Sequence, residues 1–243
     1  MVGIVVENLV AGYGNVRVLH DVSIDVADKQ TVALLGTNGN GKSTLLSCIA
    51  GLIRPTKGQI ILVDGEERTD LTSLSPKEIV GAGVSMVPEG RRLFPLLTVE
   101  ENLVLGAYRP EARVVRGETL EYCFALFPRL AERRTQQAGS MSGGEQQMLA
   151  VARALMSVPK LLLIDEPSVG LAPILVQQMI EKIGELSKSK GLTVLMAEQN
   201  FNQAMRIADY GHIIVHGEIV FHSDVESLKE NELVKSFYLG VTQ

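Results

Sequence analysis

A glycine-rich loop constrains the fold more than any other feature of this sequence, and it reads Gly36-Thr37-Asn38-Gly39-Asn40-Gly41-Lys42-Ser43. The apolar run Thr31 to Leu35 before it is typical of a buried strand, and Thr44 to Ala50 after it is typical of the start of a helix. Glycines allow backbone N–H groups to turn inward around an anion, and the amino end of a helix adds a positive dipole there. A purely structural turn is the alternative, but the fixed Lys42 and Ser43 and both flanks argue against it. The stretch therefore predicts a nucleoside triphosphate site.

The same loop predicts how a triphosphate would be held. Lys42 is expected to reach the β- and γ-phosphates, and Ser43 is expected to offer its hydroxyl to Mg²⁺. The loop residues that we expect to contact the nucleotide are Gly36, Asn38, Gly39, Asn40, Gly41, Lys42, Ser43 and Thr44.

A second apolar strand ends in two acids. Leu161 to Ile164 is followed directly by Asp165 and Glu166. Asp165 is expected near the Mg²⁺ held by Ser43, and Glu166 is placed to polarise an attacking water. A helix cap or a surface acid is the structural alternative for Glu166, although an acidic pair after a buried apolar run is otherwise costly.

Composition narrows the function classes. The 243 residues are 46% hydrophobic, which is enough for one large domain or two small ones. The net charge of −5 argues against a nucleic-acid-binding surface spread over the molecule, so no nucleic-acid partner is expected. Cys48 and Cys123 match no metal or redox spacing, and we expect them to be small buried residues of a cytosolic chain. No apolar run approaches the roughly 18 to 20 residues that cross a bilayer, so any role at a membrane is expected to go through a partner.

The order of strand and helix patterns predicts an α/β fold with a P-loop NTPase core and a mainly parallel sheet. An antiparallel β subdomain is expected near the amino terminus, and a helical subdomain is expected to be inserted between two strand-bearing halves. We expect one domain over 1–243, with the core and β subdomain in 1–89 and 158–222, the helical insert in 90–157 and a tail in 223–243.

Local signals place the ends of several helices. Three helices are expected to start with a capping box, in which a serine or threonine is followed three residues later by glutamate. Gly191 is expected to close the helix over 174–189. Pro110 and the segment 127–130 are expected to end the helices that precede them. The capping pairs are Ser75 with Glu78, Thr98 with Glu101, and Ser142 with Glu145.

The sequence alone allows two interpretations of Tyr13 and two of the Ser142-Gly143-Gly144 run. Tyr13 stands between two glycines in a predicted turn from 11 to 15, where its ring could stack on adenine or be a plain surface tyrosine. Ser142, Gly143 and Gly144 open a helix, where they serve as a cap or as a second anion site. His212 and His222 could approach each other across a hairpin over 211–221, but no acid or cysteine stands at ligand spacing beside them.

The phosphate loop, the Ser142-Gly143-Gly144-Glu145-Gln146 run about a hundred residues later and the strand ending in Asp165-Glu166 together resemble the ATP-binding cassette family. The resemblance covers nearly the whole chain. It implies that two such subunits face head to tail, so that Ser142, Gly143 and Gly144 of one subunit cap the γ-phosphate held by the other subunit's loop. It also favours adenine stacking for Tyr13, because the family has an aromatic residue there.

Further segments are similar to the ATPase subunits of branched-chain amino acid importers. They are 87–94, 97–103, 168–173, Glu198-Gln199-Asn200 and Phe237-Tyr238-Leu239-Gly240. This resemblance implies an ATPase at the cytoplasmic face of the cell membrane. Its expected partners are two hydrophobic permease subunits, a second cassette ATPase of the same or a related kind and, indirectly, a periplasmic or extracellular substrate-binding protein. Its expected cofactors are ATP and Mg²⁺, and importers of urea, amides or aromatic acids share parts of these segments.

Two positions depart from the wider family. Glu89 stands where most cassettes have a glutamine that contacts Mg²⁺ and the attacking water, and Gln199 stands where most have a histidine that contacts the γ-phosphate. Glutamine can donate a hydrogen bond but cannot shuttle a proton. The negative charge of Glu89 needs an offset from Mg²⁺, Arg91 or Arg92. We assign Glu166, Gln199 and Glu89 to the catalytic set, and Ser43, Asp165 and Glu89 to the metal set.

Two other functions remain open on the sequence. One is a transporter ATPase for a different cargo, including lipopolysaccharide-type export. The other is a soluble cassette ATPase acting in translation, DNA repair or chromosome handling. The translation type carries two cassettes in one chain, and the repair type inserts long coiled coils between the phosphate loop and the Ser-Gly-Gly run. Neither feature is found in this sequence.

Overall fold

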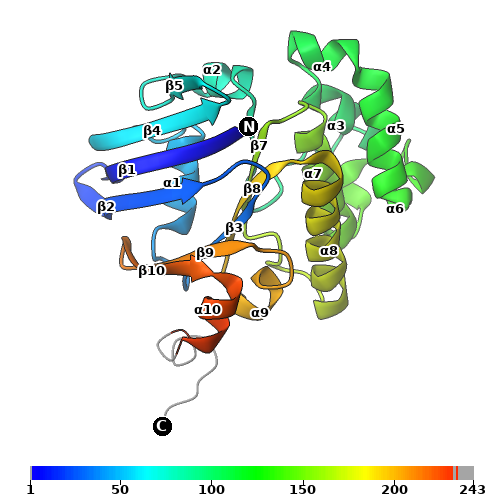
Figure 1. Ribbon diagram of the computed structural model, residues 1–243. Coiled ribbons are helices and arrows are strands. Elements are labelled where there is room, and N and C mark those ends of the chain that lie inside the picture. The colour runs from blue at the N-terminus through cyan, green and yellow to red at the C-terminus, as the bar shows by residue number, and fades with distance from the viewer. Residues whose placement is uncertain (1, 232–233, 235–243) are drawn as a thin grey trace.

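The computed structural model describes residues 2–231 and 234, and these form two sheets with helices between and around them (Figure 1). The first sheet is antiparallel in the order β2-β1-β4-β5 and lies at the left of Figure 1. Its strands are β1 (Val2–Tyr13), β2 (Val16–Val26), β4 (Lys57–Asp64) and β5 (Glu67–Asp70). Helix α1 (Lys42–Ile49) contacts both this sheet and the second one. The expected antiparallel β subdomain is therefore present.

The second sheet has the order β10-β9-β3-β8-β7-β6. Its strands are β3 (Thr31–Leu35), β6 (Val84–Val87), β7 (Leu161–Asp165), β8 (Thr193–Glu198), β9 (Tyr210–Val215) and β10 (Glu218–Asp224). All neighbouring pairs are parallel except β9 and β10, which form the expected hairpin. The register pairs Leu35 with Glu198 and Asp165 with Ala197. Because parallel strands end at the same edge, the segments after β3, β7 and β8 emerge side by side.

Each central strand is buried on both faces, and its alternate residues enter two separate cores. In β7, Leu161 and Leu163 pack with α1 and the antiparallel sheet, whereas Leu162 and Ile164 pack with the helices on the other face. All five residues of β3 and of β7 are buried. This explains their continuous apolar sequence, since a strand covered on both faces needs no polar alternation.

The chain between β6 and β7 is helical and lies at the right of Figure 1, as the sequence predicts. Thr98 and Ser142 cap α3 and α7 through the expected capping boxes with Glu101 and Glu145. The helices here are α3 (Val99–Gly106), α4 (Pro110–Val114), α5 (Arg116–Leu126), α6 (Pro128–Glu132) and α7 (Gly143–Leu155), with a 3-10 turn at Ala138–Ser140.

The other helices connect the strands. Ser75 and Glu78 form the third expected capping box, at the start of α2, and Gly191 ends α8 with a φ of 59°. These helices are α2 (Pro76–Gly81), α8 (Pro173–Lys190), α9 (Phe201–Ala204) and α10 (Val225–Glu230). The segment 237–240, used in the resemblance, lies outside the described residues.

Several local expectations were wrong. Pro110 begins helix α4, and the helix before it already ends at Gly106, because proline is also favoured in the first turn of a helix. Helix α5 does end at Leu126, where the segment 127–130 was expected to break it, but Pro128 then begins α6. Tyr13 is the last residue of β1, so the turn comprises only Gly14 and Asn15. Strand β5 was not expected, and β10 runs to Asp224, one residue beyond the expected start of the tail at 223.

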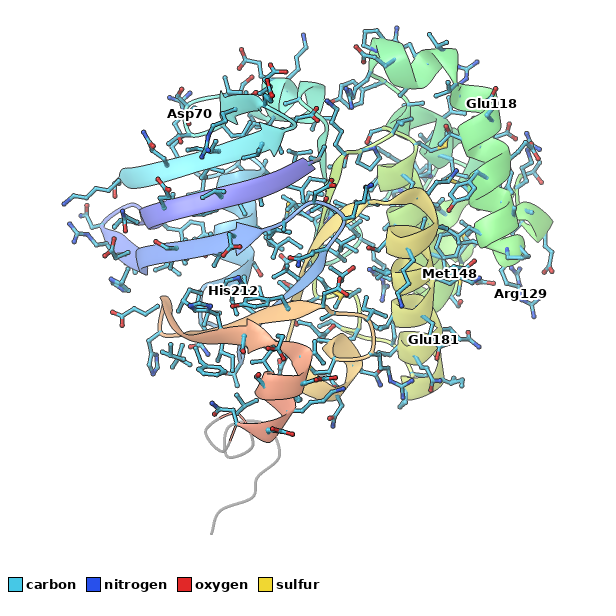
Figure 2. All side chains as sticks on the ribbon, in the orientation of Figure 1. Asp70, Glu118, Arg129, Met148, Glu181 and His212 are labelled. Atoms are coloured by element: carbon cyan, nitrogen blue, oxygen red, sulfur yellow. The ribbon has the colours of Figure 1, made fainter. Side chains whose placement is uncertain are left out.

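Other side chains confirm or refine the sequence reading. Cys48 and Cys123 are free and buried, as expected. Arg134 makes a bidentate contact with Glu100, and Arg133 pairs with Glu145, so both arginines hold ion pairs. His212, labelled in Figure 2, stacks against His222 with ring centroids 5.5 Å apart, and its Nε2 lies 3.3 Å from the carbonyl oxygen of Asp25. Within the described residues no helix is both long and apolar enough to cross a membrane.

Candidate nucleotide site

The glycine-rich loop connects β3 to α1 and owes its shape to residues without side chains. Gly39 and Gly41 have φ values of 83° and 100°, which other residues adopt only under strain. A Cβ on Gly36 would lie 2.6 Å from the carbonyl oxygen of Ile214, so the loop passes close to β9. The loop therefore curls directly before the amino end of α1, where backbone N–H groups lack helical partners.

Lys42 is held at the centre of this loop. Its Nζ donates to the carbonyl oxygens of Gly36 at 2.8 Å and Thr37 at 3.1 Å. The same ammonium lies 2.9 Å from Oε1 of Glu166, and both side chains are almost fully buried. A buried ion pair of this kind persists only when its hydrogen bonds are satisfied, and here three oxygens surround one ammonium. The structure thus brings the expected phosphate ligand and the expected catalytic acid into direct contact.

Ser43 and Asp165 meet as the sequence predicts. The Ser43 hydroxyl donates to Oδ1 of Asp165 at 3.0 Å. Burial raises the pKa of Asp165 to about 6, and the negative charges of Glu166 and Glu89 add to this, while the Ser43 hydrogen bond and Lys42 oppose it. Burial and neighbouring negative charges both raise a carboxyl pKa, because each disfavours the charged form.

This grouping of carboxylates fits a divalent cation. Asp165, Glu166 and Glu89 interact electrostatically around Ser43, with Lys42 as the nearby cation. Mg²⁺ is usually bound in proteins through one or two carboxylates or hydroxyls, with phosphate oxygens and waters completing its shell. Within the described residues no group of three or more His, Cys, Asp or Glu side chains could hold a metal ion unaided. The residues present suit a Mg²⁺ that arrives together with a nucleotide.

One cavity of about 350 Å³ brings most of the expected nucleotide contacts together. Tyr13 stands at its rim with 57% of its surface exposed, which leaves the ring free to stack. The residues that line it are Tyr13, Val18, Asn38, Gly39, Gly41, Lys42, Ser43, Thr44, Glu89 and Glu166.

Several expected site residues lie outside this cavity. The Asn40 side chain donates to Thr37 Oγ1 and accepts from the backbone N–H of His216, so it fastens the loop to the β9–β10 hairpin. Gln199 is exposed just beyond β8. Ser142, Gly143 and Gly144 stand at the start of α7 and do not line the cavity of their own subunit.

Arg91, one of the three offsets expected for the charge of Glu89, contacts α7 through its side chain. Its guanidinium donates to the side-chain oxygens of Gln147 at 3.3 Å and Gln146 at 3.2 Å, both on α7. It also fills the space beside Gly143, whose ideal Cβ would lie 3.2 Å from Nη2. Arg91 and Arg92 have positive φ values of 65° and 44°, an uncommon conformation for arginine. The segment after Glu89 is therefore held against α7 in a strained form.

Sequence reasoning missed the role of Glu198. This residue ends β8 and is fully buried, and its Oε1 accepts hydrogen bonds from Ser168, Gln199 and Asn200. An acid at the end of an apolar strand was a usable signal, because it repeats the pattern of Asp165 at the end of β7.

A larger cleft of about 590 Å³ lies away from the phosphate loop, at the amino ends of β7 and β8. Its walls include Val2, Tyr122 and Leu186, with the Lys190 ammonium 4.0 Å from the centre of the Tyr122 ring. The smaller cavity is the better candidate because it contains the glycine loop, the hydroxyl and the acids that phosphate chemistry requires.

Comparisons with known proteins agree with this site. Residues 19–169 match the family model described as ABC transporter. The chain is 48% identical to the high-affinity branched-chain amino acid transport ATP-binding protein BraG of Pseudomonas aeruginosa, over 94% of this chain and 95% of that protein. It is 30% identical to BraF, a second high-affinity branched-chain amino acid transport ATP-binding protein of Pseudomonas aeruginosa, over 97% of this chain and 96% of that protein.

Solved structures show the same fold. A nucleotide-free ATP-binding cassette from an ABC transporter superposes with a TM-score of 0.83 at 25% identity, covering 100% of both chains. A dimeric bacterial ABC transporter cassette gives a TM-score of 0.77 at 27% identity, covering 91% of this chain and 98% of that one. The family match and the relatives show that the chain belongs to the ABC transporter family, as one of its ATP-binding cassettes.

Proposed function

We propose that this cassette hydrolyses ATP to power the import of branched-chain amino acids. The observation that carries the hydrolytic part is the Lys42–Glu166 ion pair, which lies in one cavity with Ser43 and Tyr13. The names of BraG and BraF support the choice of cargo.

In this proposal water attacks the γ-phosphorus in line with the bond that breaks. Lys42 and the loop N–H groups bind the phosphates, and Tyr13 stacks on adenine. Glu166 accepts a proton from the attacking water at a carboxylate oxygen. Ser43, Asp165 and Glu89 would hold Mg²⁺, which when bound neutralises charge on the phosphate oxygens.

The site is completed by a second subunit. Ser142, Gly143 and Gly144 present the amino end of α7, and helix amino ends bind phosphate well. Because these residues do not line their own subunit's cavity, they are free to cap the γ-phosphate of a facing cassette. Gln199 donates a hydrogen bond to the γ-phosphate that is held by its own subunit's loop. BraF and BraG of one organism are two different cassettes, which supports a related second ATPase as the partner.

The remaining partners are two hydrophobic permease subunits, to which this cassette binds at the cytoplasmic face of the membrane, and a substrate-binding protein on the outer side. A cleft of about 230 Å³ supports this, since Phe94, Leu105 and Tyr108 give it apolar walls that suit a helix of a permease. Phe94 is 50% exposed, whereas Leu93 packs against the core. Closing of the two cassettes around ATP would be transmitted to this cleft through the segment from Glu89 to Phe94.

Affinity purification of the chain from its native membranes in mild detergent tests this assembly. We expect two permeases and a second cassette to accompany the wild type. Phe94→Ala should lose the permeases, while Leu52→Ala, at an exposed leucine outside this cleft, should retain them. Recovery of ribosomal or DNA-bound proteins, or of no membrane protein, would contradict the proposed transporter.

A further inference from the structure

Glu198 is a buried acid whose position connects two segments of the nucleotide site. It is the last residue of β8, and its side chain has no solvent exposure, whereas Asp165 and Glu166 retain 3% and 7%. Burying a carboxyl group without compensation is costly, so its contacts indicate why the position is acidic.

All the hydrogen bonds that the structure gives this carboxyl fall on one oxygen. Oε1 accepts from the Ser168 hydroxyl at 2.7 Å, from the Gln199 backbone N–H at 2.9 Å and from the Asn200 backbone N–H at 3.0 Å. Oε2 is buried and has no partner. Three donors therefore converge on a single oxygen, which offers only two lone pairs.

The donors come from two different segments. Gln199 and Asn200 follow β8, and Ser168 follows β7, two residues after Glu166. A second link joins these segments, because the Glu166 backbone N–H donates to the carbonyl oxygen of Ala197 at 3.0 Å. Glu166 itself has a φ of 48°, a conformation that needs support from its surroundings.

The electrostatics agree with this geometry. Burial raises the pKa of Glu198, and the negative charge of Glu166 adds to the rise, while the three hydrogen bonds oppose it. The two glutamates are therefore near enough to interact, although no hydrogen bond joins them.

We propose that Glu198 is a positioning residue for ATP hydrolysis, and that its Oε1 fixes Gln199 relative to Glu166 by joining the segment after β8 to the segment after β7. This inference rests on the proposed function, in which Glu166 activates water and Gln199 contacts the γ-phosphate. Because glutamine cannot shuttle a proton, Gln199 can contribute only a hydrogen bond to the phosphate. The geometry of that bond depends on where the Gln199 backbone is held.

The two substitutions Glu198→Gln and Glu198→Ala distinguish the effect of the accepting oxygen from the effect of the negative charge. Glutamine keeps a carbonyl oxygen that can accept from the same three donors and places an NH₂ at the partnerless Oε2. Alanine removes the acceptor and leaves the N–H groups of Gln199 and Asn200 to water. Ser168→Ala removes one donor and leaves the other two.

Hydrogen exchange measures the connection without any need for activity. In the full-length protein we expect the Gln199 and Asn200 amides to be protected in the wild type and in Glu198→Gln, and to exchange faster in Glu198→Ala. Equal protection in all three proteins would overturn the proposed connection, and it would do so whether or not the protein hydrolyses ATP.

Steady-state ATP hydrolysis by the same variants, assembled with the native partners, measures the consequence. We expect Glu198→Ala to lower kcat by about 10-fold to 100-fold with little change in KM, because small misplacements of reacting groups cost about that much. Glu198→Gln should recover most of the rate, and Ser168→Ala should fall between them. Normal kcat in Glu198→Ala, or a loss in Glu198→Gln as large as in Glu198→Ala, would overturn the positioning role. A wild type without ATPase activity would instead contradict the proposed function.

Discussion

The Nζ atom of Lys42 lies 2.9 Å from Oε1 of Glu166, so the proposed phosphate ligand is paired directly with the proposed general base. The ammonium is simultaneously bonded to two carbonyl oxygens of its own loop. A phosphate entering the loop competes for this ammonium, since a charge-assisted contact with phosphate is strong. Binding of ATP is thereby expected to release Glu166 towards the attacking water.

Lys42→Ala and Glu166→Gln both remove this ion pair, but they differ in the phosphate contact. We expect Lys42→Ala to weaken ATP binding by about 100-fold, since it loses charge-assisted contacts to two phosphates. Glu166→Gln should bind ATP within about threefold of the wild type, because the loop stays intact. Titration with a fluorescent ATP analogue measures both affinities.

The two variants also control for each other. If both variants lose thermal stability to the same extent, the loss comes from the broken ion pair. The difference between their affinities for ATP then measures the contact of Lys42 with phosphate. Equal affinities for Lys42→Ala and wild type would show that the loop binds phosphate without its lysine.

The raised pKa of Asp165 predicts a pH dependence of stability in metal-free protein. Burial raises this pKa to about 6 from an ordinary value of 3.8, so the folded state favours the neutral carboxyl. The contribution of the neutral Asp165 carboxyl to the free energy of unfolding is therefore fully present below about pH 4, and it is lost as the pH rises through about 6. The loss is at most about 3 kcal/mol, which corresponds to a shift of about two pKa units.

Asp165→Asn supplies the comparison, because it has no proton to lose at this position. Urea unfolding from pH 4 to pH 7 without Mg²⁺ should show the free energy of unfolding of wild type falling relative to that of Asp165→Asn. Parallel curves for the two proteins would mean that Asp165 ionises as it does in the unfolded chain.

Arg91 and Arg92 form a matched pair for testing the connection between the nucleotide site and α7. Both have positive φ, but only Arg91 contacts Gln146 and Gln147, while Arg92 is exposed. Arg91→Gln should lower kcat for ATP hydrolysis by about 10-fold, because the amino end of α7 loses a support beside Gly143. Arg92→Gln should remain within about twofold of wild type. Equal effects of the two substitutions on kcat would show that strain in the segment, and not the Arg91 contacts, is what matters.

Local chemistry made part of the fold predictable. The capping boxes at Ser75, Thr98 and Ser142 form as expected because each involves residues only three positions apart. The contact of Ser43 with Asp165 also follows from the sequence, since Asp165 ends β7 and Ser43 comes just after the loop that follows the parallel strand β3. The parallel strand order and the two motifs therefore both predict a site at the carboxyl-end edge of one sheet.

Long-range contacts explain what the sequence did not predict. Strand β5 is entirely polar, and it pairs only with β4 at the edge of the sheet, so neither alternation nor an apolar run marks it. The hydrogen bond from Ser168 to Glu198 joins positions 30 residues apart, and no local pattern indicates that one oxygen accepts three donors. The Arg91 contacts with α7 likewise depend on how the helical segment packs on the core.

Phosphate release from ATP by the purified complex, compared between wild type and Glu166→Gln, tests the central claim most directly. The account predicts Mg²⁺-dependent hydrolysis by the wild type and a rate lower by about 10²-fold to 10⁴-fold in Glu166→Gln, since the substitution keeps the shape of the side chain but removes the base. Equal rates in the two complexes, or a wild-type complex that binds ATP without releasing phosphate, would contradict it.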